Sequence, residues 1–256
     1  GGGDSSSSSS GSGGDGAGGG AGGCRLVKLS PLSLLLPTTT TTIDAVVDVD
    51  ERSSTATSDA FVGEREVFSA SHQNVVVVRL PLLWGVGATA MLDLAAAAVK
   101  DGSWRWYSGG RYKISTLHIQ NCIEGVLKAA VRGNSRQCYY ITDGQPVEFR
   151  SFVQRLLAVK NLDASNCGDY WGLYRLVAVA PPVPLYLQKQ CTVIDSKARK
   201  QLKYKSLKKI DEGVKELRDY YQEQQQQQRI AAAEAQRQQL QLQQERQVEE
   251  AKGVEV

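Results

Sequence analysis

The sequence predicts an α/β fold with a largely parallel sheet. Two observations lead to this prediction. The run Val75–Leu80 is nearly continuous in β-branched residues, which is typical of a parallel strand covered on both faces. From Phe61 onward, short strand-like runs alternate with helical segments of about 10–15 residues, which is the pattern of βαβ units.

Low-complexity sequence precedes the folded region. Residues 1–23 are almost entirely Gly and Ser, so we expect a disordered leader, because these residues supply no side chains to offset the entropy of ordering. Residues 24–60 are poorly defined and partly of low complexity, as in Thr38–Thr42, although Ile43–Val49 could form a strand. We therefore place the folded domain at residues 61–221.

Helices and strands are expected in alternation across this domain. The predicted helices are Glu64–Ala70, Ala88–Lys100, Asn121–Arg132 and Phe149–Val159. Gly102 and Gly133 follow two of them and suit the end of a helix. Cys138–Thr142 is a predicted strand. Trp104–Tyr107 and Tyr112–Thr116 flank a Gly-Gly pair, which is a hairpin-like signal.

The regular alternation ends beyond Leu162. Gly172–Gln188 mixes apolar residues with prolines, so we expect a loop or a surface-lying segment. Ser196–Leu202 is predicted as a basic helix and Ile210–Tyr221 as another. Residues 222–256 form a tail rich in Gln, Glu and Arg with little apolar periodicity, which predicts a solvated helix or disorder.

Composition excludes several functional classes. The formal net charge is +3, so no overall field favours nucleic acid as a partner. Five scattered cysteines without a CxxC pair, and two histidines, argue against a disulfide-framed module and against a metal centre. The longest apolar stretches are about ten residues, short of the roughly 18 that span a bilayer. We expect a cytoplasmic protein.

Three motifs have structural interpretations that we favour over functional ones. Gly85–Ala90 fits GxGxxA between a strand and a helix, but the loop from Pro81 is longer than a dinucleotide-binding turn, and no acidic residue stands about 20 positions on. Tyr204 and Lys208 fit YxxxK inside a lysine-rich stretch, where chance matches are common. Lys197–Lys209 is basic without interleaved aromatic residues, as on a solvated face.

Aromatic and histidine side chains are also more commonly structural. His118 lies in an apolar strand, where a hydrogen-bonded structural histidine is commoner than a catalytic base. The set Trp104, Trp106 and Tyr107 is interpreted as packing rather than as a ligand cage.

Four blocks of sequence resemble, in the same order, the extended short-chain dehydrogenases/reductases, and most closely the 3β-hydroxysteroid dehydrogenase/isomerase family. The blocks are Val76–Gly85 (family pattern "tvaLRPxxvwGpg"), Thr116–Asn121 ("vHVdN"), Tyr139–Val147 ("YyvtDgePv") and Asp195–Tyr204 ("dxsKARreLGY"). The resemblance covers residues 64–160 and a stretch near 191–217. It makes Tyr204 part of a structural C-terminal motif. It also implies that residues 61–221 are the C-terminal part of such a domain, with part of a doubly wound, Rossmann-like sheet and a small substrate-binding region.

The resemblance implies an NAD(P)-dependent oxidoreductase that acts on a secondary alcohol, with a sterol as a candidate. The cofactor is then NAD or NADP, and the partner is a small-molecule alcohol or sterol. The loop Pro81, Leu82 and Leu83 would run past the nicotinamide and contact the cofactor largely through its backbone. Trp84, Tyr107 and His118 would line the substrate side.

The chain also departs from the family's pattern. No Gly-rich strand–helix turn precedes residue 60, so the nucleotide-binding half is expected to be absent or replaced. Aligning Glu64 with the family places Ala56 and Ala60 at the catalytic Tyr and Lys, and a shifted register offers Phe61 and Arg65. Phe has no ionisable hydroxyl and Arg does not deprotonate, so we assign no catalytic residue.

We therefore expect a truncated or inactive member of the family. One alternative is a non-catalytic scaffold whose tail pairs with other helices, and another is a mis-assembled gene model, since the chain starts with Gly and has one Met. Gly172–Gln188 stands where the family has an often membrane-associated stretch, so peripheral membrane contact is a further expectation. In a half-domain, Val75–Leu80 would sit at an exposed sheet edge.

Overall fold

The computed structural model describes residues 25–31, 59–70, 74–170 and 190–253. The Gly/Ser leader, the predicted strand Ile43–Val49 and the segment Gly172–Gln188 lie outside the described residues.

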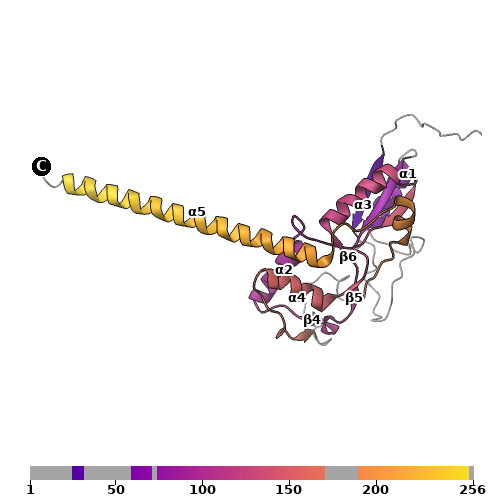
Figure 1. Ribbon diagram of the computed structural model, residues 1–256, viewed down its shortest axis with the longest axis horizontal. Coiled ribbons are helices and arrows are strands. Elements are labelled where there is room, and N and C mark those ends of the chain that lie inside the picture. Colours follow the sequence, from indigo (N-terminus) through magenta and orange to yellow (C-terminus); the bar gives the residue numbers. More distant parts are fainter. Residues whose placement is uncertain (1–24, 32–58, 71–73, 171–189, 254–256) are drawn as a thin grey trace, which may run out of the picture.

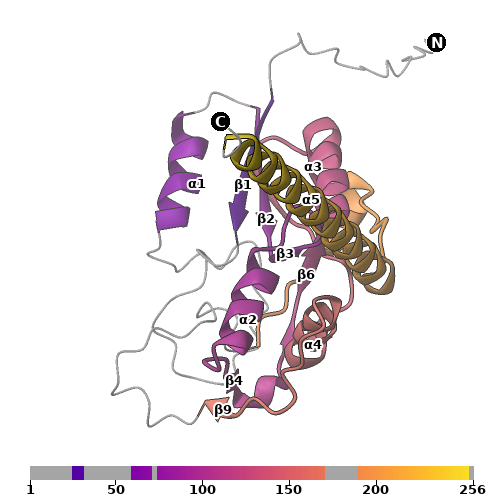
Figure 2. The same ribbon diagram turned by 90° about the vertical axis from the view of Figure 1, so that its left-hand side faces the viewer.

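A parallel sheet of three strands forms one part of the molecule (Figure 2). Strand β2 (Val75–Leu80) lies between β1 (Leu26–Pro31) and β7 (Gln137–Tyr140). Helix α1 (Asp59–Ala70) covers one face of this sheet and α3 (Ile119–Arg132) covers the other. This helix–sheet–helix layering confirms the predicted α/β, Rossmann-like fold class.

Strand β2 is central in the sheet, so the expectation of an exposed edge was wrong. All six of its residues are buried. The reason is β1, which pairs with β2 in parallel along its whole length, from Leu26 opposite Val75 to Pro31 opposite Leu80. Sequence reasoning left that stretch undefined because Pro31 interrupts its apolar run, yet proline is tolerated at the end of an edge strand.

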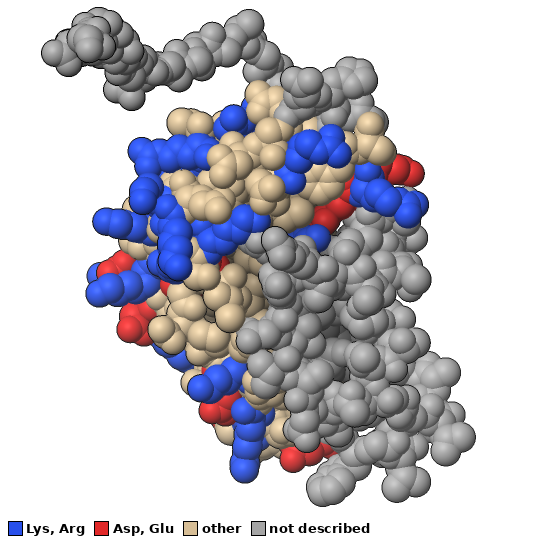
Figure 3. Space-filling view, turned by 90° about the vertical axis from the view of Figure 1, so that its right-hand side faces the viewer, with Lys and Arg blue, Asp and Glu red and all other residues tan. Residues whose placement is uncertain are grey.

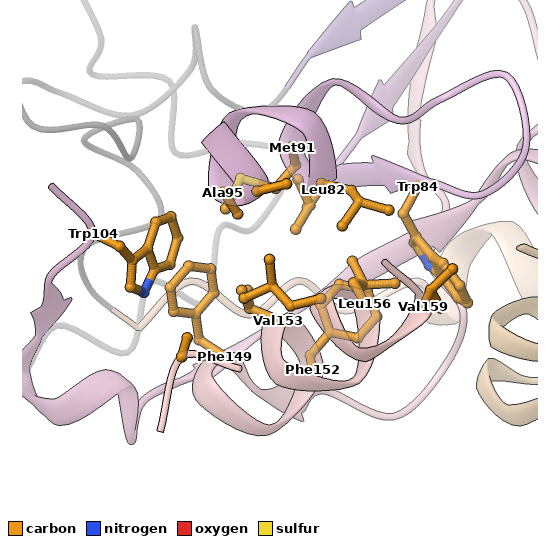
Figure 4. Close-up of a cluster of buried hydrophobic side chains, with 14 of the residues drawn as sticks. Leu82, Trp84, Met91, Ala95, Trp104, Phe149, Phe152, Val153, Leu156 and Val159 are labelled. Atoms are coloured by element: carbon orange, nitrogen blue, oxygen red, sulfur yellow. The ribbon is translucent and has the colours of Figure 1, made fainter. Parts of the chain in front are cut away.

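A hydrophobic core rich in aromatic side chains lies beside the sheet (Figure 4). It is enclosed by α2 (Ala90–Lys100), α4 (Phe149–Val159) and the first turns of α5 (Ile210–Gly253). Strands β3 (Leu82–Trp84) and β6 (Thr116–His118) pair in parallel between this core and the sheet. The predicted helix Phe149–Val159 is confirmed at both ends.

The hairpin expected around Gly109-Gly110 is not formed. Instead, β4 (Trp106–Tyr107) pairs in parallel with β9 (Asp169–Tyr170), and β5 (Lys113–Ile114) pairs in antiparallel fashion with β8 (Val147–Glu148). The glycines lie in a 3₁₀ turn, η2 (Ser108–Gly110), at φ of +65° and +71°. A Cβ on Gly110 would lie 2.8 Å from Arg150 Cβ and 2.9 Å from Trp106 Cε3, so this turn is fixed by close packing on α4.

The C-terminal helix is much longer than its packed part. The first turns of α5 bury Val214 and Leu217 in the aromatic core. Beyond Tyr221 the helix projects away from the rest of the molecule, and its described side chains are almost all exposed (Figure 1). The predicted basic helix Ser196–Leu202 is a short π-helix, η5 (Ala198–Leu202). Among the described residues, no helix combines the length and apolar character needed to cross a membrane.

A buried ion pair joins α1 to the centre of the sheet. Arg79 Nη2 on β2 lies 2.7 Å from Glu64 Oε2 on α1, with both side chains less than 5% exposed. The same guanidinium donates from Nη1 to the Tyr140 hydroxyl of β7 at 2.8 Å. Three elements therefore meet at one buried cation.

Removing Arg79 should destabilise the fold strongly. Arg79→Leu leaves the Glu64 carboxylate buried without its partner, and we expect a loss of about 3–5 kcal/mol in the free energy of unfolding, measured by urea denaturation. The double variant Glu64→Leu/Arg79→Leu should lose less, because no buried charge remains. The exposed Arg65→Leu is the control and should change stability by about 0.5 kcal/mol or less. A single variant no less stable than the double variant would contradict this account.

Candidate cofactor- and substrate-binding site

The segment Pro81–Leu83, expected to form a loop beside the cofactor, follows the carboxyl end of β2. The structure corrects this expectation in part, because Leu82 and Leu83 belong to strand β3 and Pro81 alone separates β3 from β2. Pro81 and Leu82 are buried, and Leu83 is half-buried. In open α/β sheets, ligands bind outside the carboxyl ends of the parallel strands. The segment therefore occupies the part of the fold where a dinucleotide would be expected.

Trp84 and His118 pack against each other at the carboxyl ends of β3 and β6. They are directly opposite in the β3–β6 register, and their ring centroids lie 4.8 Å apart in an edge-to-face arrangement. Phe152 of α4 contacts the other side of Trp84, at 5.3 Å between centroids. Both Trp84 and His118 are fully buried.

Tyr107 lies apart from the other five predicted site residues. It is on β4, next to Trp106, whose ring packs on Trp104 at 5.3 Å. Figure 4 shows Trp104 and Trp84 at opposite ends of the aromatic cluster. The structure thus gathers Pro81 to Trp84 and His118 at β3 and β6. Contact of Trp84, Tyr107 and His118 with substrate stays a prediction.

One carboxylate organises the region around β3 and β6. Asp143 Oδ2 accepts hydrogen bonds from Trp84 Nε1 at 2.8 Å and from Thr116 Oγ1 at 2.9 Å. Its Oδ1 accepts from the His118 backbone N–H and from Asn121 Nδ2, both at 2.7 Å. Four donors from β3, β6 and α3 thus converge on one side chain.

Asn121 extends this network to the start of α5. Its Oδ1 accepts from the backbone N–H groups of Leu207 and Lys208, and its Nδ2 also donates to the Lys208 carbonyl. Sequence reasoning did not single out Asp143 or Asn121 as functional residues. Asp143 stands inside the block Tyr139–Val147 and Asn121 inside the block Thr116–Asn121, both of which resemble the family's pattern. The resemblance therefore pointed to the two segments but not to these two residues.

Burial and hydrogen bonding favour the neutral form of the His118 imidazole. Burial lowers its pKa, and the positive charge of Lys208 acts in the same direction, against the carboxylates of Asp143 and Glu216. Its Nδ1 accepts from the Gln120 backbone N–H at 3.3 Å and caps α3, so the proton belongs on Nε2. Among the described residues, Nε2 has no hydrogen-bond partner.

Two glycines make room for this imidazole. A Cβ on Gly85 would lie 2.7 Å from His118 Nε2, and one on Gly213 of α5 would lie 2.7 Å from Trp84 Cη2. Gly85 also has a φ of +113°. The first glycine of the GxGxxA match is therefore explained by packing within the fold.

The YxxxK match is likewise accounted for by packing. Tyr204 is buried and donates its hydroxyl to the Thr142 carbonyl at 2.8 Å, and burial raises its pKa. Lys208 Nζ lies 2.9 Å from Glu216 Oε2. Of the positions aligned with the family's catalytic pair, Ala60 lies in α1, whereas Ala56 lies outside the described residues. The alternative Arg65 is exposed.

The neutral state of His118 should make stability depend on pH. Its pKa is lowered in the folded chain, whereas the unfolded chain should show the ordinary value near ~6.5. Below that pH the unfolded chain binds more protons, so folding stability is lost as the pH falls. We expect the melting temperature to drop between about pH 7.5 and about pH 5.5. The drop should shrink in His118→Gln.

His72 is the other histidine of the chain, so His72→Gln is the matched control and should keep the pH dependence of the unsubstituted protein. Equal slopes of melting temperature against pH in all three proteins would show that His118 does not carry this effect.

Comparison with known proteins gives no match to any family model. A ketoreductase of Stigmatella aurantiaca, named for 4-hydroxy-2-methyl-3-oxo-4-farnesyl-3,4-dihydroquinoline-1-oxide, is 36% identical over 160 residues, which are 56% of this chain and 48% of the relative. The decarboxylating sterol-4-alpha-carboxylate 3-dehydrogenase of Dictyostelium discoideum is 26% identical over 168 residues, 58% of this chain and 51% of the relative. The chain thus spans about half the length of the curated relatives it matches.

Solved structures show the same fold. A DesIV double mutant, a dTDP-glucose 4,6-dehydratase of Streptomyces venezuelae with NAD bound, has a TM-score of 0.57 and 17% identity, covering 78% of this chain and 60% of the other. UDP-glucose 4-epimerase of Thermotoga maritima has a TM-score of 0.56 and 13% identity, covering 78% and 64%. The curated relatives bear out the resemblance to the extended short-chain dehydrogenases/reductases, and the solved structures bear out the fold.

Proposed function

We propose that this chain is the substrate-side part of an NAD(P)-dependent oxidoreductase of the short-chain dehydrogenase type. The observation that carries this proposal is the position of the segment Pro81–Leu83. It leaves the carboxyl end of the central strand β2 at Pro81 and forms the first two residues of β3, which the Asp143 network fixes against β6. NAD bound to the DesIV structure, which shares this fold, supports NAD or NADP as the cofactor.

The proposed substrate is a secondary alcohol, or the matching ketone, on an apolar carbon skeleton. The names of the two relatives support this class, because one specifies a farnesyl-bearing ring system and the other a sterol. The aromatic core with Trp84 at one end and Tyr107 near the other would lie behind such a substrate. Trp84 and His118 are buried here, so we assign them to shaping the substrate side.

We further propose that this chain alone does not catalyse the reaction. Proton transfer to or from the alcohol needs an ionisable group near the nicotinamide. The positions that align with the family's Tyr and Lys carry no such pair in either register.

Cofactor binding and catalysis can be tested separately. Titration with NAD⁺ or NADPH should raise the melting temperature in a concentration-dependent way if the segment Pro81–Leu83 retains affinity, because a ligand of the folded state stabilises it. AMP at the same concentration is the control for nonspecific nucleotide binding. Incubation with NAD⁺ and a 3β-hydroxysteroid should give no NADH absorbance.

A flat thermal response in a protein that melts cooperatively would contradict the cofactor assignment. Formation of NADH would contradict the assignment of inactivity and would direct attention to a different proton donor.

A scaffold role is the second candidate, and the length of α5 favours it. The helix continues for 44 residues, and after Tyr221 its described side chains have almost no packing against the rest of the protein. A long polar helix without tertiary contacts gains little stability from propensity alone. Ile230 and Leu240 are exposed and ten residues apart, a spacing that fits one side of a paired helix.

Deleting residues 222–256 tests this role. If the tail pairs with a second copy, light scattering on a sizing column should show a dimer for the full chain and a monomer for the deletion. Ile230→Glu/Leu240→Glu should act like the deletion, whereas Gln225→Glu/Gln236→Glu, with the same added charge, should act less. A monomer in every case would leave self-association through the tail without support.

A further inference from the structure

The outer face of α3 presents large apolar side chains to solvent. Ile123, Leu127 and Val131 are 54%, 57% and 76% exposed. They are four residues apart, so they share one face of the helix. The face turned to the sheet is made instead of small residues, among them Gly125 and Ala129. A Cβ on Gly125 would come within 2.2 Å of Ile141 Cδ1, so close packing on the sheet requires this arrangement.

Basic residues border this apolar face. Lys128 and Arg132 follow Leu127 and Val131 by one position and therefore lie beside them on the helix. The one acidic residue among positions 120–132 is Glu124, and it pairs with Lys128 at 3.3 Å. One edge of the apolar stripe thus carries positive charge.

The π-helix η5 and the segment after it extend the basic border. Asn134, just after α3, donates to Gln201 Oε1 of η5 at 3.4 Å, and Tyr139 donates to the same atom at 3.0 Å. The exposed side chains around Gln201 are Lys200, Lys203 and Lys205. Figure 3 shows Lys and Arg gathered over one face of the molecule, with few acidic side chains among them.

Leu207 adds an apolar side chain at the other end of α3. Its backbone N–H donates to Asn121 Oδ1 at 2.8 Å, which fixes it near the first turn of the helix, and its side chain is 64% exposed. The surface therefore combines exposed apolar residues with at least five basic ones.

We propose that this surface binds an anionic lipid membrane, lying on it rather than crossing it. The combination of Ile, Leu and Val on a helix face with a lysine and arginine border is what an interfacial helix requires, because the apolar side chains enter the headgroup boundary and the cations meet anionic headgroups. A nucleic acid would use the cations but would leave the apolar stripe in water, and the surface offers no aromatic side chains for base stacking. The inference does not depend on the proposed oxidoreductase function.

Vesicle co-sedimentation of the full chain tests the proposal. The protein should pellet with phosphatidylcholine vesicles that contain about 30% phosphatidylserine and should stay in solution with pure phosphatidylcholine, and added salt should release it. The variant Lys200→Glu/Lys203→Glu/Lys205→Glu should bind at least about 100-fold more weakly, since each basic residue near the surface contributes about fivefold.

The matched control is Lys100→Glu/Lys113→Glu/Lys215→Glu, which makes the same change in charge at exposed lysines of α2, β5 and α5. Its affinity for the anionic vesicles should fall only moderately and should stay much closer to that of the unsubstituted chain than the affinity of the first variant does. Leu127→Ser/Val131→Ser should weaken binding while retaining its salt dependence. The melting temperature of each variant is measured first. It should match that of the unsubstituted protein, because every changed side chain is exposed.

An equal loss of vesicle affinity in both charge variants would show that binding depends only on net charge. That result would overturn the assignment of this surface. Binding to neutral vesicles as strong as to anionic ones, or no binding to either, would overturn the proposal. So would binding of a double-stranded oligonucleotide with the vesicles left unbound.

Discussion

The convergence of four hydrogen-bond donors on the Asp143 carboxylate is the constraint on which the candidate site depends. It holds Trp84 of β3, Thr116 and the His118 backbone of β6, and Asn121 of α3 in one arrangement. A carboxylate can leave water when charged or polar donors replace its hydration. Here the donors come from β3 and from the consecutive elements β6 and α3, which follow it later in the chain. Asn121 then passes the same constraint to the chain that enters α5.

A second buried polar cluster plays the corresponding part in the sheet. Arg79 binds Glu64 and Tyr140, so α1, β2 and β7 keep one mutual register. The two clusters lie on either side of the segment Pro81–Leu83, one at Arg79 of β2 and one at Trp84 of β3. The position of this segment is therefore fixed from both ends by buried polar contacts, while the apolar cores fill the space around them.

The sequence predicted the regular elements well and the pairings poorly. The apolar periodicity of α4 and the β-branched run of β2 are local signals, and both were predicted correctly. The partners of β4 and β5 are residues from Val147 onward, and one of the two partners of β2 lies in the stretch that ends at Pro31. Which strand pairs with which depends on tertiary packing and is not encoded in a local sequence pattern. The same holds for Asp143, whose role becomes visible once β3, β6 and α3 are placed together.

The projecting part of α5 has a consequence for how the molecule moves in solution. At about 1.5 Å per residue, a helix of 44 residues is about 66 Å long. Such a rod, fixed at one end by Val214 and Leu217, makes rotational diffusion strongly anisotropic. Tumbling end over end would be slower than spinning about the helix axis, so nuclear relaxation rates would differ between amide bonds parallel and perpendicular to that axis, even in a rigid molecule.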